Sequence, residues 1–384
     1  MAVAAYLYPW DVDGDPGAAD RIAALGITEV SLAAAYHAVR AVTPFHPGHR
    51  IVTRDAAVYY RRDPARWAGA HLVPPDPGPA EVGSFERAAG ALRAAGLAVN
   101  AWVVVAHNGR LAAAHPECAV RNAYGDPYPW ALCAGSPAVA EYAAALAAEI
   151  AALEAVAGVE LEACGWYGYD HGSAHDKTGG TLPGPAARLL DACFCAGCSA
   201  TLRVAGADPE PVAAAVRSAL DGGGEVPDDL AAGLGTVRSA TAASFLEHVV
   251  AAVRAVAPAG RILVHAHPDP AEAGSNPGFG LPVLLGPAGA DGIILACPGP
   301  AEPAAAFAAS TVQAVQAAEA AGSVTAGRQV IATLPAVAAL GADTGELPAK
   351  AKAVLAAGAT GLRLYHAGLA SAADHTALRA VAQL

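Results

Sequence analysis

The sequence predicts an α/β fold: a (β/α)8 barrel, or TIM barrel, with long loops after strands two and four. First, short β-type runs alternate with helical runs along nearly the whole chain, which implies parallel strand pairing. Second, there are eight such units, the number that closes a barrel. Third, the first strand is followed by PWDVDGDPG and not by a glycine-rich phosphate loop. The third observation disfavours the main alternative, an open doubly wound sheet.

We predict one domain over residues 1–384, built from eight strands and the helices between them. The predicted strands are 3–9, 27–36, 97–106, 158–164, 262–268, 291–297, 329–335 and 360–366. The clearest predicted helices are 16–25, 84–95, 137–156, 236–256, 303–321, 348–357 and 371–383. Several strands follow a helix and a glycine, as in LGITEV, AGVELE and AGATGLRL. Glycine after a helix end supplies a left-handed cap.

Two connections are much longer than the usual few residues. They are 37–83, rich in Pro, Arg, His and Tyr, and 165–235, which ends in an Ala/Gly/Pro/Asp-rich tail. Both follow strands, so both are expected on the carboxyl-terminal face, where barrel enzymes build their sites. Segment 165–235 is predicted to be an insertion that serves as a lid or as a solvent-facing loop.

Composition excludes several classes of function. The net charge of −12 argues against nucleic acid and anionic lipid as partners. No apolar run reaches the roughly 18 to 20 residues of a membrane helix, and the N-terminus lacks a basic region before its apolar run. The seven cysteines, an odd number in a large chain, favour reduced thiols over a disulfide framework. The expected location is the cytoplasm.

The densest chemistry lies in ELEACGWYGYDHGSAHDK, residues 160–177. Glu160 and Glu162 share one face of the fourth strand, because side chains alternate with period two. Both should point into the barrel, with Glu162 nearer the mouth. A buried carboxyl group needs a partner or becomes a better general acid. The alternative is a structural ion pair with an inward arginine such as Arg363.

The loop after the fourth strand adds further candidates: Trp166, Tyr167, Asp170, His171 and His175. Paired carboxylates with aromatic side chains are typical of glycoside cleavage, which needs an acid, a nucleophile or base, and flat faces for sugar rings. Histidine and carboxylate together also suit several divalent metals. We therefore predict Glu162, Asp170 and Glu160 as the catalytic candidates.

Polar and aromatic groups also end other predicted strands. They are Tyr8, Trp10, Asp11, Tyr36, His37, Arg40, His107, Asn108, His265, His267, Tyr365 and His366. Their shared position at one end of the barrel is a stronger signal than any one of them. The predicted substrate-binding residues are Trp10, Tyr36, His37, Arg40, Trp102, His107, Asn108, Trp166, Tyr167, His171, His175, His265, His267 and Tyr365.

CFCAGC places Cys193, Cys195 and Cys198 close together. Three thiols at this spacing can hold a structural zinc ion if a fourth ligand comes from elsewhere. The candidate fourth ligands are Cys118, Cys133, Cys164 and a nearby histidine. The alternative is a set of reduced thiols packed in the loop.

The run NAYGDPYPWALCAGSPAV, the strand ending in ELEAC, and LLDACFCAGC resemble the uncharacterised glycoside-hydrolase-like (β/α)8 proteins of bacteria. YLYPWDVDGDP, AAAYHAVRAVTPFHPGHR and GLRLYHAGL are also similar to the strand ends of that group. The resemblance implies a carbohydrate-active barrel with Glu162 at the strand-four acid position. One departure is ATLPAV at the end of strand seven, where retaining barrel glycosidases commonly place a nucleophilic glutamate.

Three hypotheses follow. The first is a glycosidase that needs no cofactor and acts on a carbohydrate or glycoside, with Glu162 as general acid/base and Asp170 as second carboxylate. The second is a metal-dependent hydrolase or sugar isomerase on the same barrel face. It lacks the dinuclear amidohydrolase pattern, because no HxH follows strand one and no lysine ends strand four. The third is a non-catalytic carbohydrate-binding barrel.

Overall fold

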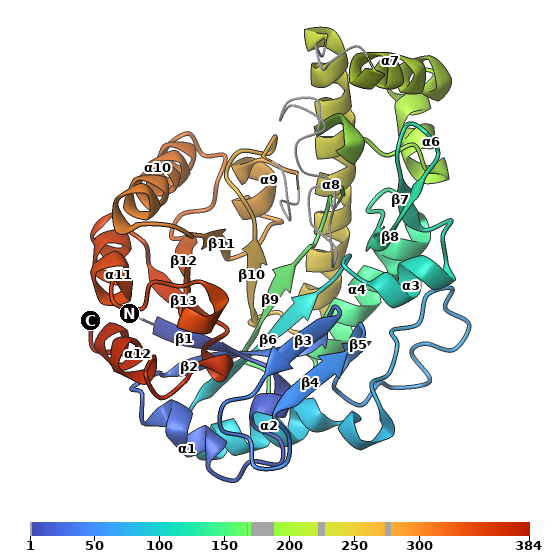
Figure 1. The fold of residues 1–384 in the computed structure, drawn as a ribbon. Helices are drawn as coiled ribbons and strands as arrows, with labels where there is room; N and C mark the ends of the chain where they lie inside the picture. The colour runs from blue at the N-terminus through green and yellow to red at the C-terminus, as the bar shows by residue number, and fades with distance from the viewer. Residues whose placement is uncertain (1, 167, 170–187, 222–226, 273–277) are drawn as a thin grey trace.

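The computed structural model describes residues 2–166, 168–169, 188–221, 227–272 and 278–384. At its centre is a closed barrel of eight parallel strands (Figure 1). They are β1 (Ala2–Leu7), β2 (Glu29–Tyr36), β6 (Ala98–Val104), β9 (Gly158–Glu162), β10 (Arg261–His265), β11 (Gly292–Ala296), β12 (Gln329–Pro335) and β13 (Gly361–Tyr365). β1 forms hydrogen bonds with β13 on one side and with β2 on the other, and these pairings close the barrel. The predicted (β/α)8 barrel is confirmed.

Helices surround the barrel on its outside (Figure 1). They are α1 (Ala18–Ala23), α2 (Ser84–Ala94), α4 (Pro137–Ala151), α8 (Asp228–Val256), α9 (Leu281–Leu285), α10 (Ala301–Ala320), α11 (Leu347–Ala356) and α12 (His375–Ala382). One of them follows each barrel strand. The short α9 has no predicted counterpart, and α8 begins well before the predicted start at residue 236.

Smaller elements decorate the connections. A hairpin of β3 (Val39–Val42) and β4 (Ile51–Arg54) lies in the first long loop, where β5 (Ala57–Val58) also pairs antiparallel with β2. A second hairpin, β7 (Ala119–Arg121) with β8 (Pro127–Leu132), follows α3 (Gly109–Ala114). This third long connection, between β6 and α4, was not predicted. Segment 165–235 holds α6 (Ala196–Val204) and α7 (Pro209–Asp221), so most of its Ala/Gly/Pro/Asp-rich tail is helical.

Glycines set the junctions between helices and strands in two different ways. Gly26, Gly96 and Gly358 follow helices with φ of 84°, 85° and 101°, the left-handed cap that the sequence predicted. Gly158 has another role as the first residue of β9. A Cβ atom there would lie 2.6 Å from the carbonyl oxygen of Arg261 on the neighbouring strand. That position therefore needs glycine for close strand approach, not for a cap.

One side of the barrel interior is charged. Arg363 of β13 forms an ion pair with Glu160 of β9 at 2.7 Å, and both side chains are about 1% exposed. Below them, Arg261 contacts Glu29 at 2.6 Å and the Asn100 side-chain oxygen at 3.1 Å. Glu160 thus forms the structural ion pair with Arg363 that was the alternative to a catalytic role.

Another part of the barrel interior is apolar. Leu263, Ile294 and Ile331 form a small buried cluster of their own. They come from β10, β11 and β12, which are consecutive in the barrel. The ion-paired side chains of the interior thus lie beside an apolar cluster, and Thr333 of β12, in register with Arg363, adds a buried hydroxyl group.

No helix among the described residues is both long and apolar enough to cross a membrane.

Replacing Arg363 by alanine should destabilise the barrel, because Glu160 would remain buried without its counter-charge. Breaking one partner of a buried pair costs about 3–5 kcal/mol. Urea unfolding followed by circular dichroism measures the loss. Arg379→Ala on the exposed face of α12 is the matched control and should cost less than about 0.5 kcal/mol. Equal losses in the two variants would contradict a stabilising role for the pair.

Candidate functional site

Glu162 is the last residue of β9, so its side chain stands at the carboxyl-terminal mouth of the barrel. It is half-buried, and the Trp102 indole Nε1 donates a hydrogen bond to its Oε2 at 2.7 Å. No described arginine, lysine or histidine forms a salt bridge with it. The next residue, Ala163, has a left-handed φ of 50°, which marks the bend where the chain leaves the strand. Trp102 thus orients the Glu162 carboxyl group, and no basic side chain of the described residues pairs with it.

The charge of Glu162 acts on four tyrosines that lie in or directly after β1, β2 and β13: Tyr6, Tyr8, Tyr36 and Tyr365. Burial raises the pKa of each phenol well above its usual value, and the negative charge of Glu162 adds to the shift. All four therefore remain protonated at neutral pH. The Tyr8 hydroxyl donates to the Tyr36 hydroxyl at 3.0 Å, which links the segment just after β1 to the end of β2.

Three histidines share the mouth with Glu162. Burial lowers the pKa of His37, His265 and His366, while the Glu162 charge raises it. Burial prevails, and for His366 the pKa falls to about 4. The imidazoles are therefore neutral at pH 7, so each carries one N–H donor and one acceptor nitrogen.

The hydrogen bonds assign the tautomers of two of these rings. His37 Nδ1 contacts the Ala38 carbonyl oxygen at 2.7 Å, so Nδ1 carries the proton. The Tyr6 hydroxyl donates to Glu160 Oε2 at 2.9 Å. His265 Nε2, 2.8 Å from the Tyr6 oxygen, must then donate to it, because that hydroxyl has already used its only proton. His37 Nε2 and His265 Nδ1 are left as acceptors.

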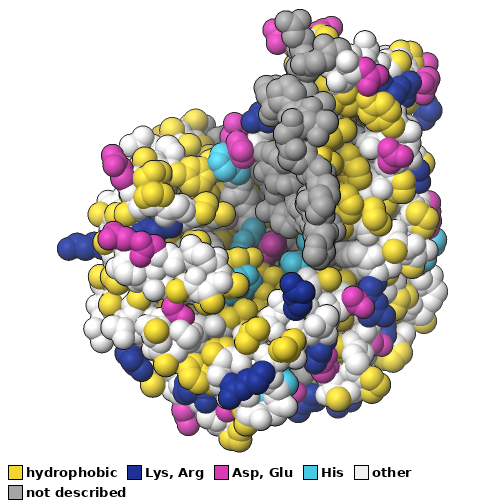
Figure 2. Space-filling model, in the orientation of Figure 1, with side chains coloured by type: hydrophobic (Ala, Val, Ile, Leu, Met, Phe, Trp, Pro, Cys, Tyr) yellow, Lys and Arg dark blue, Asp and Glu magenta, His cyan; other side chains and the backbone are white. Residues whose placement is uncertain are grey.

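Ring stacking packs the polar side chains into one surface. The His37 ring stacks on Tyr36 and on His107, with centroids 4.2 Å apart in both pairs. Figure 2 shows histidine side chains and an acidic side chain gathered in a hollow at the centre of this face. The arrangement offers neutral donors and acceptors next to a carboxyl group, which suits a ligand rich in hydroxyl groups.

Several predicted substrate-binding residues are packed into the protein instead of exposed. Trp10, Trp102 and Trp166 are 4%, 0% and 5% exposed, so none of them presents an open ring face. Trp10 stacks on Tyr8, and the Arg238 guanidinium lies 5.4 Å over the Trp166 ring. Their role as sugar contacts stays a prediction, whereas Trp102 has a defined role in holding Glu162.

The remaining candidates lie in different surroundings. Asn108 caps α3, because its side chain accepts from the Leu111 backbone N–H at 3.0 Å. Arg40 is exposed on β3, and half-buried His267 stacks on Phe307 with centroids 4.8 Å apart. Tyr167, Asp170, His171 and His175 lie outside the described residues.

Tyr6 at the mouth was not predicted, whereas Tyr8 and His366 were named among the strand-end groups but not among the substrate-binding residues. Period-two alternation along β1 places Tyr6 and Tyr8 on one face, so that signal was available. His366 has a left-handed φ of 58°, and its Nδ1 lies 3.2 Å from the Tyr8 hydroxyl. No sequence pattern marks that backbone conformation, which is uncommon for a residue other than glycine.

Clusters of metal-binding residue types occur away from these groups. Among the described residues there are two: Cys133 with Cys193, Cys195 and Cys198, and His71 with Glu117 and Cys118. Neither includes Glu162 or a histidine at a barrel strand end. The three predicted cysteines thus meet Cys133, one of the four candidate partners.

Folding stability should decrease as the pH falls from about 6.5 toward about 4. In this window the unfolded chain takes up a proton on His366 that the folded chain does not bind, so acid favours unfolding. His366→Asn, which tolerates the left-handed backbone, should flatten the dependence of Tm on pH. His248→Asn, on the exposed face of α8, should leave it unchanged. Identical pH profiles for all three proteins would contradict the assignment of a buried neutral His366.

No protein-family model matches the chain, and no curated protein matches its sequence. Solved structures do match its fold. The chain is similar to α-L-fucosidase isoenzyme 2 from Paenibacillus thiaminolyticus, with 13% identity and a TM-score of 0.60 over 100% of this chain and 48% of the other. It is also similar to the PgaB (BpsB) glycoside hydrolase domain from Bordetella bronchiseptica, with 18% identity and a TM-score of 0.61 over 98% and 97%.

A third similar structure is the β-galactosidase from the psychrophilic Marinomonas ef1, with 13% identity and a TM-score of 0.56 over 100% of this chain and 59% of the other. The chain thus spans about half the length of the fucosidase and nearly all of the PgaB domain. At these identities the likeness establishes the fold, a (β/α)8 barrel shared with enzymes that are named for glycoside cleavage.

Proposed function

We propose that the protein is a glycoside hydrolase in which Glu162 is the general acid/base. The observation that carries the proposal is the position of this carboxyl group and its set of contacts. It stands at the barrel mouth, is held by Trp102, and has no basic partner among the described residues. The names of the fold's solved relatives add support, because a fucosidase, a glycoside hydrolase domain and a β-galactosidase share this barrel.

The proposed mechanism follows from the contacts of Glu162. Trp102 engages Oε2 and orients the carboxyl group, so Oε1 is the atom that would deliver a proton to the glycosidic oxygen. As the bond breaks, negative charge returns to the carboxylate. The Trp102 N–H, 2.7 Å away, stabilises that charge without moving. The acid step thus depends on a carboxyl group that Trp102 orients and that forms no ion pair with a described basic side chain.

The neutral rings would bind sugar hydroxyls. His37 Nε2 and His265 Nδ1 are acceptors by the tautomers assigned above, and hydroxyl groups can donate to them. The stacked Tyr36, His37 and His107 rings would form one wall of the subsite. This is the substrate class we propose: a carbohydrate or a small glycoside.

The second carboxylate is the open part of the mechanism. Glu160 is occupied by Arg363 and Tyr6, which favours a structural role. The seven residues of β12, QVIATLP, contain no carboxylate. We therefore propose Asp170, eight positions after Glu162. A carboxyl separation of about 5–5.5 Å would give retention of the anomeric configuration, and about 6.5–9.5 Å would give inversion.

We also propose a cytoplasmic location, which the seven free cysteines support. A metal-dependent hydrolase or isomerase and a non-catalytic carbohydrate-binding barrel are the competing functions. Neither cluster of metal-binding residue types among the described residues contains Glu162. The variants below separate the three functions.

Glu162→Gln should lower kcat/KM on natural glycosides by about 10²–10⁴-fold, because the amide cannot donate the proton. Glycosides with activated aryl leaving groups should lose much less, since they depart without protonation. Steady-state kinetics on both substrate types measures the difference. Glu154→Gln, on an exposed position before β9, is the matched control and should retain wild-type rates.

Unchanged turnover in Glu162→Gln would refute Glu162 as the acid/base. If the wild-type protein bound sugars in calorimetry but cleaved no glycoside, the binding barrel would replace the enzyme. Activity that disappeared with a chelator and returned with a divalent metal would favour the metal-dependent alternative.

Asp170→Asn should also reduce hydrolysis by at least about 10²-fold if Asp170 is the second carboxylate. Asp20→Asn, exposed on α1, should not. Proton NMR of the first product released by the wild type gives the anomeric outcome. A wild-type rate in Asp170→Asn would show that the second carboxylate is another group or that the substrate supplies it.

A further inference from the structure

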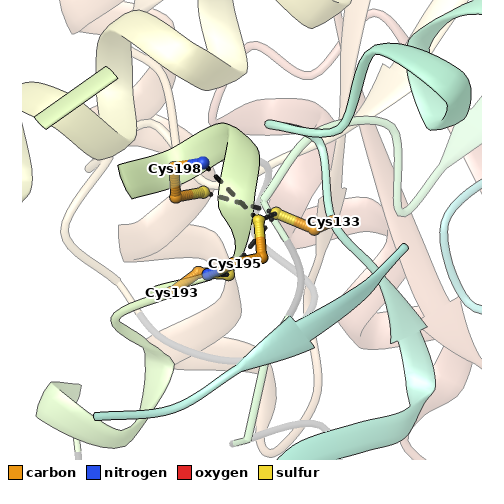
Figure 3. A group of neighbouring side chains, drawn as sticks. All are labelled: Cys133, Cys193, Cys195 and Cys198. Carbon is orange, nitrogen blue, oxygen red and sulfur yellow. Dashed lines mark hydrogen bonds between the residues drawn. The ribbon is translucent and has the colours of Figure 1, made fainter. Parts of the chain in front are cut away.

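Four buried cysteines from two distant parts of the chain meet at one point (Figure 3). Cys193 and Cys195 precede α6, Cys198 lies in its first turn, and Cys133 follows β8. Their sulfur atoms all lie within 4.8 Å of one another. Figure 3 shows the four side chains pointing toward a common centre, with Cys133 opposite the other three.

The spacing of the sulfur atoms fits a tetrahedral metal site. Cys133 Sγ lies 3.5, 3.6 and 3.4 Å from the sulfurs of Cys193, Cys195 and Cys198. Four thiolates about 2.3 Å from a zinc ion would stand about 3.8 Å apart. A disulfide requires about 2.05 Å. The four thiols are therefore close to coordination distance and clearly unbonded.

Backbone N–H groups point at the cluster, which is what buried thiolate charge requires. Three of the four sulfurs accept such bonds: from Arg121 N to Cys193 at 3.3 Å, Gly135 N to Cys133 at 3.4 Å, Cys195 N to Cys193 at 3.4 Å and Cys198 N to Cys195 at 3.5 Å. Hydrogen bonds to ligand atoms orient them and tune the metal. Four neutral thiols packed for shape alone would not need four such donors.

Two glycines allow the ligand-bearing segments to approach. A Cβ atom on Gly135 would lie 2.7 Å from Cys198 Sγ, and one on Gly197 would lie 1.9 Å from the Gly135 carbonyl oxygen. Any other residue at either position would push the two halves of the cluster apart. The local backbone is thus built for close contact between Cys133 and the CFCAGC loop.

We propose that Cys133, Cys193, Cys195 and Cys198 bind one zinc ion in a closed, structural tetrathiolate site. With four protein ligands it has no open position for substrate or water, so its role is to hold the fold together. The soft sulfur ligands and the tetrahedral arrangement favour zinc over hard cations such as Mg²⁺ or Ca²⁺. The ion would staple α6 to the segment that joins β8 to α4.

The site also reaches toward the mouth of the barrel. Asp191, two residues before Cys193, is buried and accepts the Tyr169 backbone N–H at 2.6 Å. A Cβ atom on Gly168 would lie 2.3 Å from Asp191 Oδ1, so the contact is tight. The zinc ion would therefore hold the segment that follows Glu162, whatever reaction the mouth performs.

Metal analysis of the purified protein tests the proposal directly. Mass spectrometry should find about one zinc atom per chain, as a single tetrathiolate site requires. Cys195→Ser and Cys133→Ser should lose the zinc and lower Tm. Cys164→Ser and Cys297→Ser, both buried and outside the cluster, are matched controls and should keep it. Amide exchange of the peptide around Tyr169 should accelerate in the zinc-free protein and not in the controls.

Cobalt substitution gives a readout that does not depend on the variants. Chelator-treated wild-type protein reconstituted with Co²⁺ should show the intense visible absorption of a tetrahedral thiolate site. Wild-type protein that contains no zinc and gives no cobalt spectrum would overturn the proposal. Stoichiometric iron in place of zinc, or two disulfides among these cysteines in non-reducing peptide mapping, would also overturn it.

Discussion

The buried ion pair between Arg363 and Glu160 is the constraint on which the site depends. It joins β13 and β9, which are not neighbours in the barrel, so it crosses the interior instead of following the sheet. Charges buried this deeply persist only when they are mutually satisfied. Once Arg363 holds one oxygen of Glu160, the other accepts from Tyr6, and Tyr6 in turn receives the His265 N–H. The polarity of the site follows from this chain of contacts.

Because Arg363 pairs with only one of them, two glutamates that stand two residues apart on β9 have different surroundings. Glu160 is neutralised and fully buried, whereas Glu162 reaches the mouth and contacts Trp102. Burial keeps the neighbouring tyrosines protonated and lowers the pKa of the neighbouring histidines, so these described neighbours of Glu162 are neutral hydrogen-bonding groups. Among the described residues, Glu162 is thus a carboxyl group at the barrel mouth without a basic partner and next to neutral rings, which suits the proposed acid catalysis.

The outer helices α6 and α7 are an addition to the barrel, and their attachment needs an explanation. The contact between Asp191 and Tyr169 links the added segment to the mouth. The four cysteines lie at the point where α6 meets the β8–α4 connection. A metal staple there would explain how a small appendage with limited core of its own is held in a defined position.

The sequence by itself determined the eight barrel strands, their parallel order and the position of Glu162. Local signals suffice for these features: period-two alternation, glycine after helix ends and the regular succession of strand and helix. Only the tertiary structure decided which side chains pair with one another across the fold. Arg363 pairs with a residue 203 positions away, and Cys133 joins thiols 60 or more positions away. It also buried Trp10, Trp102 and Trp166, which the sequence could equally have left exposed. Such pairings and burials depend on how the closed barrel and its long loops pack against one another, and no local sequence pattern determines that packing.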